Sequence, residues 1–340
     1  MDNKVSQKLS NKIVIINFVL SILVVSLHTN FTGKYDPSAC SMNGVYVVIK
    51  NLMDIIGDMA VPCFFIMSGL LFFRNFEYKD YGKKLLSRVF TLVIPYLIWN
   101  VVLLIYEILK TLLVDGQIAL DFGDVVLGVL LSGYNGPLWF LRTLFLYTLF
   151  APLLLLLLKV LKKYSILLVI PVILLNIFVS IDYTSVVFWF PCFFLGAYVG
   201  YYYFENLNQL TEKNSGNFKI WLGILIFIIV IVLVNYFVRA DFVYYLYRNF
   251  SGVAIFLLFL ALPFDTKKQF MTYSFFTFCT HVILLGPITI VIAKVCSFNG
   301  ILLSIGFIVA IAINVILTIL IGWLFKKLLP KVYAFVMGKR

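Results

Sequence analysis

Ionisable side chains are rare in this chain, and some of them lie inside long apolar segments. Of its 340 residues, 63% are hydrophobic and only 12% are charged. Both histidines, His28 and His281, fall within apolar runs. A neutral imidazole is a natural proton acceptor near neutral pH, and ionisable groups at membrane depth are costly enough to suggest a function. His28 is therefore a candidate general base, although each histidine could instead be structural and hydrogen-bond to a neighbouring helix.

Carboxylates and an arginine share this apolar setting. Asp54 and Asp58 are four residues apart, so they lie on one face of a helix. Asp58 could orient His28 and stabilise its imidazolium, or the two carboxylates could cap the start of a helix. Arg142 could form a salt bridge with Asp58 or Glu107, or it could hold a phosphate or a developing oxyanion. We assign the catalytic roles to His28, Asp58 and Arg142.

Further polar residues recur at helical spacing. Asn100 and Glu107 are seven residues apart and share a face. Asn17 precedes His28 by eleven residues, or three helical turns, so these two residues share a face about 16 Å apart. The residues that we expect to contact an acceptor substrate are Asp54, Asn100, Glu107, Trp139 and His281.

These residues must be positioned by membrane-spanning helices. The mean hydropathy of +1.04 excludes a soluble globular enzyme and a disordered chain. A lipid-spanning helix needs about 20 mostly apolar residues. The sequence predicts ten such helices. Tight hairpins should join the fourth to the fifth and the fifth to the sixth, and we expect a short surface helix in the polar stretch 110–136. The ten spans are 13–30, 54–73, 88–109, 137–158, 165–181, 185–204, 219–238, 249–264, 272–293 and 301–325. We therefore expect an all-α polytopic protein with a single domain over residues 1–340.

The distribution of basic residues predicts the orientation. If the N-terminus is cytoplasmic and ten helices alternate, 20 of the 27 Lys and Arg residues face the cytoplasm and 6 face outside. This bias satisfies the positive-inside rule and places both termini in the cytoplasm. It also accounts for the net charge of +12 without nucleic-acid binding. The densest cytoplasmic cluster contains Lys83, Lys84 and Arg88, which offer partners to an anionic molecule.

The same orientation separates two kinds of site. The ionisable residues expected in the outer halves of their spans are His28, Asp54, Asp58, Glu107 and Arg142. The basic residues lie mainly on the inner side. This arrangement suits a protein that links a donor inside the cell to an acceptor outside it.

Five segments of the sequence are informative in combination, although each is apolar and unspecific alone. They are ILVVSLH at 22–28, VPCFFIMSGLL at 61–71, RVFTLVIPYLIW at 88–99, PLWFLR at 137–142 and SFFTFCTH at 274–281. In this order and at these spacings, they resemble the acyltransferase-3 family of integral membrane acyltransferases. The resemblance covers essentially the whole chain.

The resemblance implies about ten core helices and transfer of an acyl group, commonly acetyl from acetyl-CoA. The resemblance also implies an acceptor that is often a hydroxyl of a cell-surface glycan. The histidine that is essential in the family corresponds to His28. An arginine usually stands eleven positions earlier, where this chain has Asn17. Arg142 or the cytoplasmic lysines would have to supply that charge, or the donor is held differently. The family's SG pair corresponds to Ser68 and Gly69, which we interpret mainly as a packing element, like the LWFL segment.

These observations predict a multi-pass acyltransferase of a bacterial cytoplasmic (inner) membrane. The enzyme is expected to transfer acyl groups other than aminoacyl groups. The expected partners are an acyl-CoA co-substrate, a glycan or lipid-linked sugar acceptor and the lipid bilayer. The donor's phosphates are expected near Lys83, Lys84 and Arg88. No residue has the setting of an activated Ser or Cys nucleophile, so direct transfer is preferred, with an acyl-His28 intermediate left open.

Two other interpretations were weighed. With two histidines and no paired cysteine spacing, we expect neither a metal site nor a permanently bound cofactor. The alternative function is a transporter or flippase for a lipid-linked or small anionic substrate. Transporters usually contain repeated halves, and no convincing repeat is found in the sequence.

Overall fold

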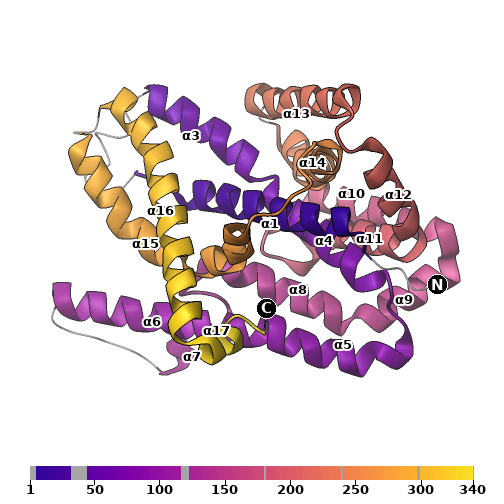
Figure 1. Ribbon diagram of the computed structural model, residues 1–340, viewed down its shortest axis with the longest axis horizontal. Helices are drawn as coiled ribbons and strands as arrows, with labels where there is room; N and C mark the ends of the chain where they lie inside the picture. Colours follow the sequence, from indigo (N-terminus) through magenta and orange to yellow (C-terminus); the bar gives the residue numbers. More distant parts are fainter. Residues whose placement is uncertain are drawn as a thin grey trace.

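The computed structural model describes residues 5–31, 44–115, 122–179, 181–238, 240–296 and 299–339. Within those ranges every regular element is helical, and the helices are packed into one body (Figure 1). The α-helices are α1 (Gln7–His28), α3 (Gly44–Gly57), α4 (Ala60–Phe73), α5 (Tyr81–Arg88), α6 (Ile94–Asp115), α7 (Phe122–Leu130), α8 (Trp139–Leu149), α9 (Ala151–Leu161), α10 (Val169–Val179), α11 (Val186–Tyr202), α12 (Phe204–Asn214), α13 (Phe218–Val238), α14 (Asp241–Ala261), α15 (Ser274–Val295), α16 (Gly300–Leu328) and α17 (Pro330–Val336).

Short helical segments of other types join several of these helices. They are η1 (Tyr78–Asp80), η2 (Val89–Val93), η3 (Gly136–Leu138), η4 (Lys162–Leu168) and η5 (Gln269–Tyr273). The expected short helix within 110–136 is confirmed as α7. Its apolar residues, such as Phe122 and Leu127, are exposed.

Seven helical stretches in the described residues are long and apolar enough to cross a membrane, and two bent pairs raise the number to as many as nine. The seven are Gln7–His28, Gly44–Phe73, Tyr78–Leu113, Phe218–Val238, Asp241–Ala261, Gln269–Val295 and Gly300–Leu328. One bent pair, Gly136–Leu149 with Ala151–Val179, contains the fourth predicted span and most of the fifth. The predicted count of ten is therefore not confirmed, because the chain bends here by 56° at Phe150.

The second predicted span begins ten residues too late. Asp54 and Asp58 do not open a helix, because α3 starts at Gly44 and the stretch Gly44–Phe73 is broken only at Asp58 and Met59. The backbone N–H of Asp58 donates to the carbonyl of Asp54 at 2.9 Å. Asp58 therefore lies at a break inside the membrane-spanning stretch.

Glycines bring three helices unusually close together. A Cβ atom at Gly69 of α4 would overlap the carbonyl oxygen of Phe193 on α11, and one at Gly196 would overlap that of Ile66. At Gly252 of α14, a Cβ would lie 2.6 Å from the backbone nitrogen of Cys63. Small residues at helix interfaces permit this approach in membranes. The predicted packing role of Gly69 is confirmed, and the same contacts draw α14 against the start of α4.

The N-terminal part of α1 is anchored by a buried ammonium group. The Lys12 side chain is almost fully buried, donates to the carbonyl of Phe259 at 3.1 Å and lies 3.0 Å from a carboxylate oxygen of Asp265. Burial opposes ionisation of Asp265, but a hydrogen bond from Ser215 and the Lys12 ammonium hold the pKa of that carboxyl below its ordinary value. The ion pair fixes α1 to the segment that follows α14.

Candidate active site

The two histidines lie against each other. The ring of His28, at the end of α1, meets the ring of His281, in α15, edge to face with centroids 5.1 Å apart. Nδ1 of His28 lies 2.8 Å from the carbonyl oxygen of Val24. Because a carbonyl only accepts, Nδ1 carries the proton and Nε2 keeps its lone pair. In the neutral ring, the fold thus leaves Nε2 of His28 as the basic nitrogen.

His281 has the same tautomer and a deeper position. Its Nδ1 donates to the carbonyl of Phe278 at 2.8 Å, and its side chain has no exposed surface. Nε2 of His281 has no hydrogen-bond partner among the described residues. His281 is therefore a buried neighbour of His28, and His28 alone of the two is exposed.

A cavity of about 420 Å³, called here the histidine cavity, opens beside His28. The predicted residues that line it are His28, Asp58, Trp139 and Arg142, from three separate parts of the chain. Sequence reasoning missed Arg248, Tyr183 and Trp189, which line it as well. The structure therefore brings together all three predicted catalytic residues.

Asp58 does not orient His28 as predicted. Its carboxylate instead binds Arg248, with nitrogen–oxygen distances of 2.9 and 3.0 Å from Nη2 and 3.3 Å from Nε. The two side chains are only 19% and 13% exposed. The predicted span 249–264 begins after Arg248, but α14 begins at Asp241 and carries Arg248 two turns into the helix. The cation also packs over the ring of Tyr244, one turn earlier, at 4.4 Å.

Arg142 forms neither of the salt bridges considered for it. Asp58 is bound to Arg248, and Glu107 lies 3.0 Å from Lys110. Arg142 has no hydrogen bond or ion pair with another described residue, and it lines the histidine cavity. A guanidinium group so placed is available to an oxyanion or another anionic group.

Aromatic rings form one wall of the histidine cavity. Trp139 and Trp189 are stacked with centroids 6.1 Å apart, and Tyr183 meets Trp139 edge-on at 5.8 Å. The indole N–H of Trp189 donates to the carbonyl of Tyr183. This contact fixes the wall on which an amphipathic ligand can pack.

Asn100 forms a hydrogen bond with the turn before α8, the helix that carries Trp139. It is fully buried, donates to the carbonyl of Tyr96 at 2.9 Å and accepts from the backbone N–H of Asn135 at 3.2 Å. Asn135 in turn donates to the carbonyl of Cys279 at 3.1 Å. Asn100 thereby holds the turn that leads into α8, and neither it nor Glu107 lines the histidine cavity. Asp54 lies outside this cavity too, paired with Lys50.

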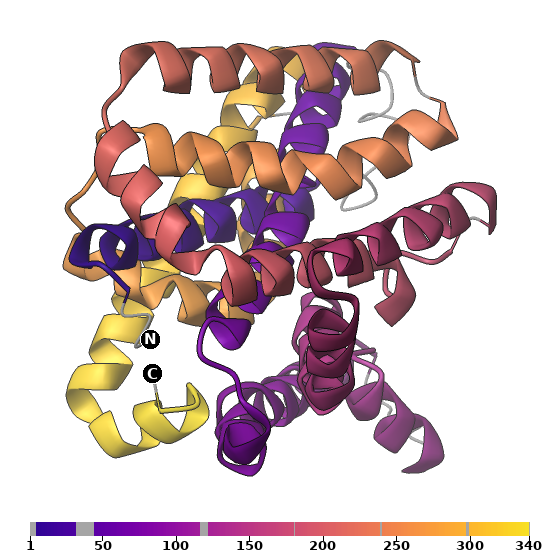
Figure 2. The same ribbon diagram turned by 90° about the vertical axis from the view of Figure 1, so that its right-hand side faces the viewer.

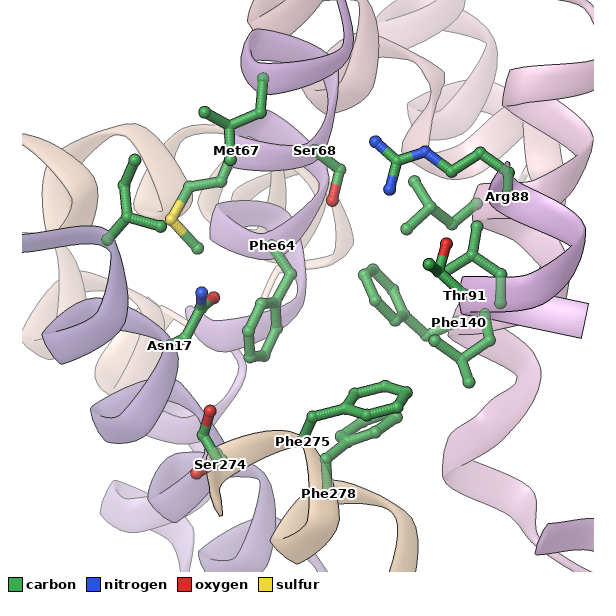
Figure 3. Close-up of a pocket in the computed structure, with 16 residues that line it drawn as sticks. Asn17, Phe64, Met67, Ser68, Arg88, Thr91, Phe140, Ser274, Phe275 and Phe278 are labelled. Atoms are coloured by element: carbon green, nitrogen blue, oxygen red, sulfur yellow. The ribbon is translucent and has the colours of Figure 1, made fainter. Parts of the chain in front are cut away.

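A second cavity, of about 350 Å³, lies beside the middle of α1 and is called here the Arg88 cavity (Figure 3). The Arg88 side chain reaches into it from one side, near the hydroxyl of Ser68, and Asn17 and Ser274 lie opposite. Asn17, which occupies the expected arginine position, thus shares a cavity with an arginine from another helix. Lys83 is exposed, and Lys84 donates to the carbonyls of Phe72 and Asn75 at 2.9 and 3.0 Å.

Three phenylalanine rings, called here the phenylalanine partition, pack against one another in the lining of the Arg88 cavity. Phe64, Phe140 and Phe278 line the Arg88 cavity, with centroid separations of 5.7 to 6.5 Å. Phe278 also lies 6.4 Å from the ring of His281. Within the LWFL segment, Trp139 faces the histidine cavity while Phe140 faces the Arg88 cavity. This segment therefore does more than pack helices, because it forms part of the partition.

Comparison with known proteins agrees with this arrangement. A family model described as an acyltransferase domain matches residues 15–327. A probable poly-beta-1,6-N-acetyl-D-glucosamine export protein of Staphylococcus aureus is 28% identical over 287 aligned residues, covering 78% of this chain and 79% of the relative. A succinoglycan biosynthesis protein of Rhizobium meliloti, ExoH, is 30% identical over 153 residues, or 41% of each chain. No solved structure matches the chain significantly.

The family match spans most of the chain. The protein therefore belongs to the acyltransferase-3 family of membrane acyltransferases. Its helices identify it as a multi-pass membrane protein. Acyl transfer is thus the general reaction for which the two cavities must account.

Proposed function

We propose that this protein transfers an acyl group, acetyl in the simplest case, from acyl-CoA in the cytoplasm to a hydroxyl of a cell-surface or exported glycan. One observation carries the proposal: α1 connects the two cavities. Asn17 lines the Arg88 cavity and His28, three helical turns later, presents a free Nε2 to the histidine cavity. Donor and acceptor can thus approach the same residue from opposite sides.

The reaction requires a base and a stabilised oxyanion. Nε2 of His28 takes the proton from the acceptor hydroxyl as its oxygen bonds to the thioester carbonyl carbon. Arg142 stabilises the negative charge that develops on the carbonyl oxygen. The carbon–sulfur bond then breaks, and His28 returns the proton to the departing thiolate. Asp58 and Arg248 hold the cavity wall as an ion pair.

Arg88 is the proposed contact for the anionic donor. It is the one member of the predicted basic cluster that lines the Arg88 cavity, whereas Lys84 is bound to backbone carbonyls. It also supplies a positive charge in the cavity where Asn17 leaves the expected arginine position neutral. The phenylalanine partition must open locally for an acyl chain to pass toward His28.

The names of the relatives support a polysaccharide acceptor. One is called a poly-beta-1,6-N-acetyl-D-glucosamine export protein and the other a succinoglycan biosynthesis protein. The stacked tryptophans of the histidine cavity suit the apolar face of a sugar ring. We therefore use β-1,6-linked N-acetylglucosamine saccharides as first acceptor probes.

The proposed location is the cytoplasmic membrane of a bacterium, with ten spans and both termini in the cytoplasm. The bias of basic residues toward one side supports this orientation. Single cysteines introduced at Gln7 and Lys339 should react with a membrane-impermeant reagent only after the cells are opened. Labelling of either position in intact cells would refute the orientation.

The test of function is thioester cleavage coupled to acyl transfer. Purified protein in liposomes, given acetyl-CoA and a saccharide acceptor, should release CoA and form an O-acetylated product. Absence of CoA release with every acceptor tried would count against the proposal.

Glycan export is the second candidate function, because the Staphylococcus aureus relative is named as an export protein. Under that alternative, labelled saccharide would cross the liposome membrane in the absence of acetyl-CoA. Transport without thioester cleavage would favour export over acyl transfer.

A further inference from the structure

A third cavity lies on the far side of the ion pair between Asp58 and Arg248. Its volume is about 480 Å³, and we call it the side cavity. It is formed between α3, α13 and α14, which pack together along one edge of the protein (Figures 1 and 2). Its polar lining consists of Asn51, Asp54, Asp58, Asn235, Tyr236, Asp241 and Tyr244.

Asn235 is the independent sign that a ligand binds there. It is the one amide in α13, a helix of otherwise almost continuous apolar residues. The residue is only 8% exposed, yet its side chain has no hydrogen bond to another described residue. The amide atoms are not among the fully buried ones, so they are accessible from the side cavity that the residue lines. A hydroxyl or amide group of a ligand in the side cavity would provide the missing partner.

The charges of the side cavity restrict the class of ligand. Asp54 is paired with Lys50 and Asp58 with Arg248. Asp241 has no ion pair with a described residue. Among the described residues that line the side cavity, the remaining charge is negative, which disfavours phosphate and other anionic groups. Carboxylates, amides and the ring of Tyr244 together suit a polyhydroxyl ligand that is neutral or carries an amino group.

The side cavity adjoins the histidine cavity at the ion pair between Asp58 and Arg248. Asp58 lines both it and the histidine cavity. Arg248 packs over Tyr244 on one side of the boundary and lies 5.4 Å from the ring of Tyr183 on the other. The two cavities are therefore close enough for neighbouring units of one chain molecule, which would cross this ion pair.

We propose that the side cavity is a second acceptor subsite, which holds a neutral or amino-bearing sugar unit next to the unit that reacts beside His28. The inference rests on the proposed function, and it makes the enzyme selective for oligomeric over monomeric acceptors. Asn235 and Asp241 are its specificity-determining residues.

The experiment compares a β-1,6-linked N-acetylglucosamine tetrasaccharide with the monosaccharide, in nanodiscs supplied with acetyl-CoA. Asn235→Leu keeps the side-chain size on an apolar helix, so the protein should remain folded. We expect it to raise the KM for the tetrasaccharide about tenfold, because one hydrogen bond to the amide contributes about that factor to binding. The KM values for the monosaccharide and for acetyl-CoA should not change. Val234→Leu, at an exposed neighbouring position, is the matched control and should behave as wild type.

Direct binding of the tetrasaccharide separates failure of the subsite from failure of the proposed function. If the wild type binds it but transfers no acyl group, while Asn235→Leu and Asp241→Asn bind it more weakly, the function fails and the subsite stands. Equal KM values of Asn235→Leu and wild type for the tetrasaccharide would overturn the subsite. An effect that follows the anionic lipid content of the nanodisc instead of acceptor length would also overturn it, by assigning the cavity to a lipid headgroup.

Discussion

Replacement of Arg142 by Gln should abolish most of the turnover while leaving the fold intact. The guanidinium lines the histidine cavity and has no hydrogen bond or ion pair with a described residue. Its removal therefore leaves no buried carboxylate without a partner. Loss of one donor to a developing oxyanion typically costs about 10²–10³ in kcat, or about 2.7–4 kcal/mol. We expect a fall of that size in kcat for acyl transfer.

The neighbouring arginine provides the matched comparison. Arg248→Gln would leave Asp58 partly buried and unpaired, and breaking such a pair typically costs about 3–5 kcal/mol of stability. The two arginine variants should therefore differ in the detergent-solubilised protein, where Arg248→Gln lowers the thermal midpoint and Arg142→Gln does not.

The assay is CoA release and product formation in liposomes at matched protein content. Arg142→Lys keeps the charge without the fork of donors, so its kcat should lie between those of wild type and Arg142→Gln. The reasoning would be refuted if Arg142→Gln retained kcat within about threefold of wild type, since one donor is worth far more. It would also be refuted if this variant lost as much stability as Arg248→Gln.

Three further changes test other parts of the account. Arg88→Gln should raise the KM for acetyl-CoA, whereas Lys83→Gln, outside the Arg88 cavity, should not; equal effects would remove the special role of Arg88. His281→Ala should reduce turnover less than His28→Ala but lower the thermal midpoint, because it removes a fully buried ring. Thermal melts and CoA release at matched abundance measure both effects, and the opposite ranking would contradict this assignment. Gly196→Ala should cost about 1–3 kcal/mol or more by overpacking α4 against α11, as measured by yield and thermal midpoint, and normal values of both would contradict the close approach.

Much of the architecture follows from hydropathy alone. Long apolar runs predict the helices of a membrane protein, and α13 and α16 begin within a residue of their predicted starts. The start of α14 was missed because the segment from Asp241 to Arg248 has a charged residue at each end and three tyrosines between them, which lower its hydropathy. The bend at Phe150 was missed because both flanking helices are equally apolar.

The sequence predicts which residues belong to the site, but it does not predict which of them pair with each other. Burial cost identifies His28, Asp58 and Arg142 as unusual, and all three meet in one cavity. Helical spacing gives the face on which a residue lies, but it does not say which helix that face meets. The close approach of Gly252 to α4 decides that Arg248, and not His28, reaches Asp58.

The most direct test of the central claim is acyl transfer by His28→Ala at matched membrane abundance. The variant removes the proposed base at the end of α1, and base catalysis is typically worth about 10²–10⁴ in rate. Acetyl transfer from acetyl-CoA to the saccharide acceptor should therefore fall at least about a hundredfold, with the thermal midpoint close to that of wild type. Near-normal turnover of the folded variant would contradict the account.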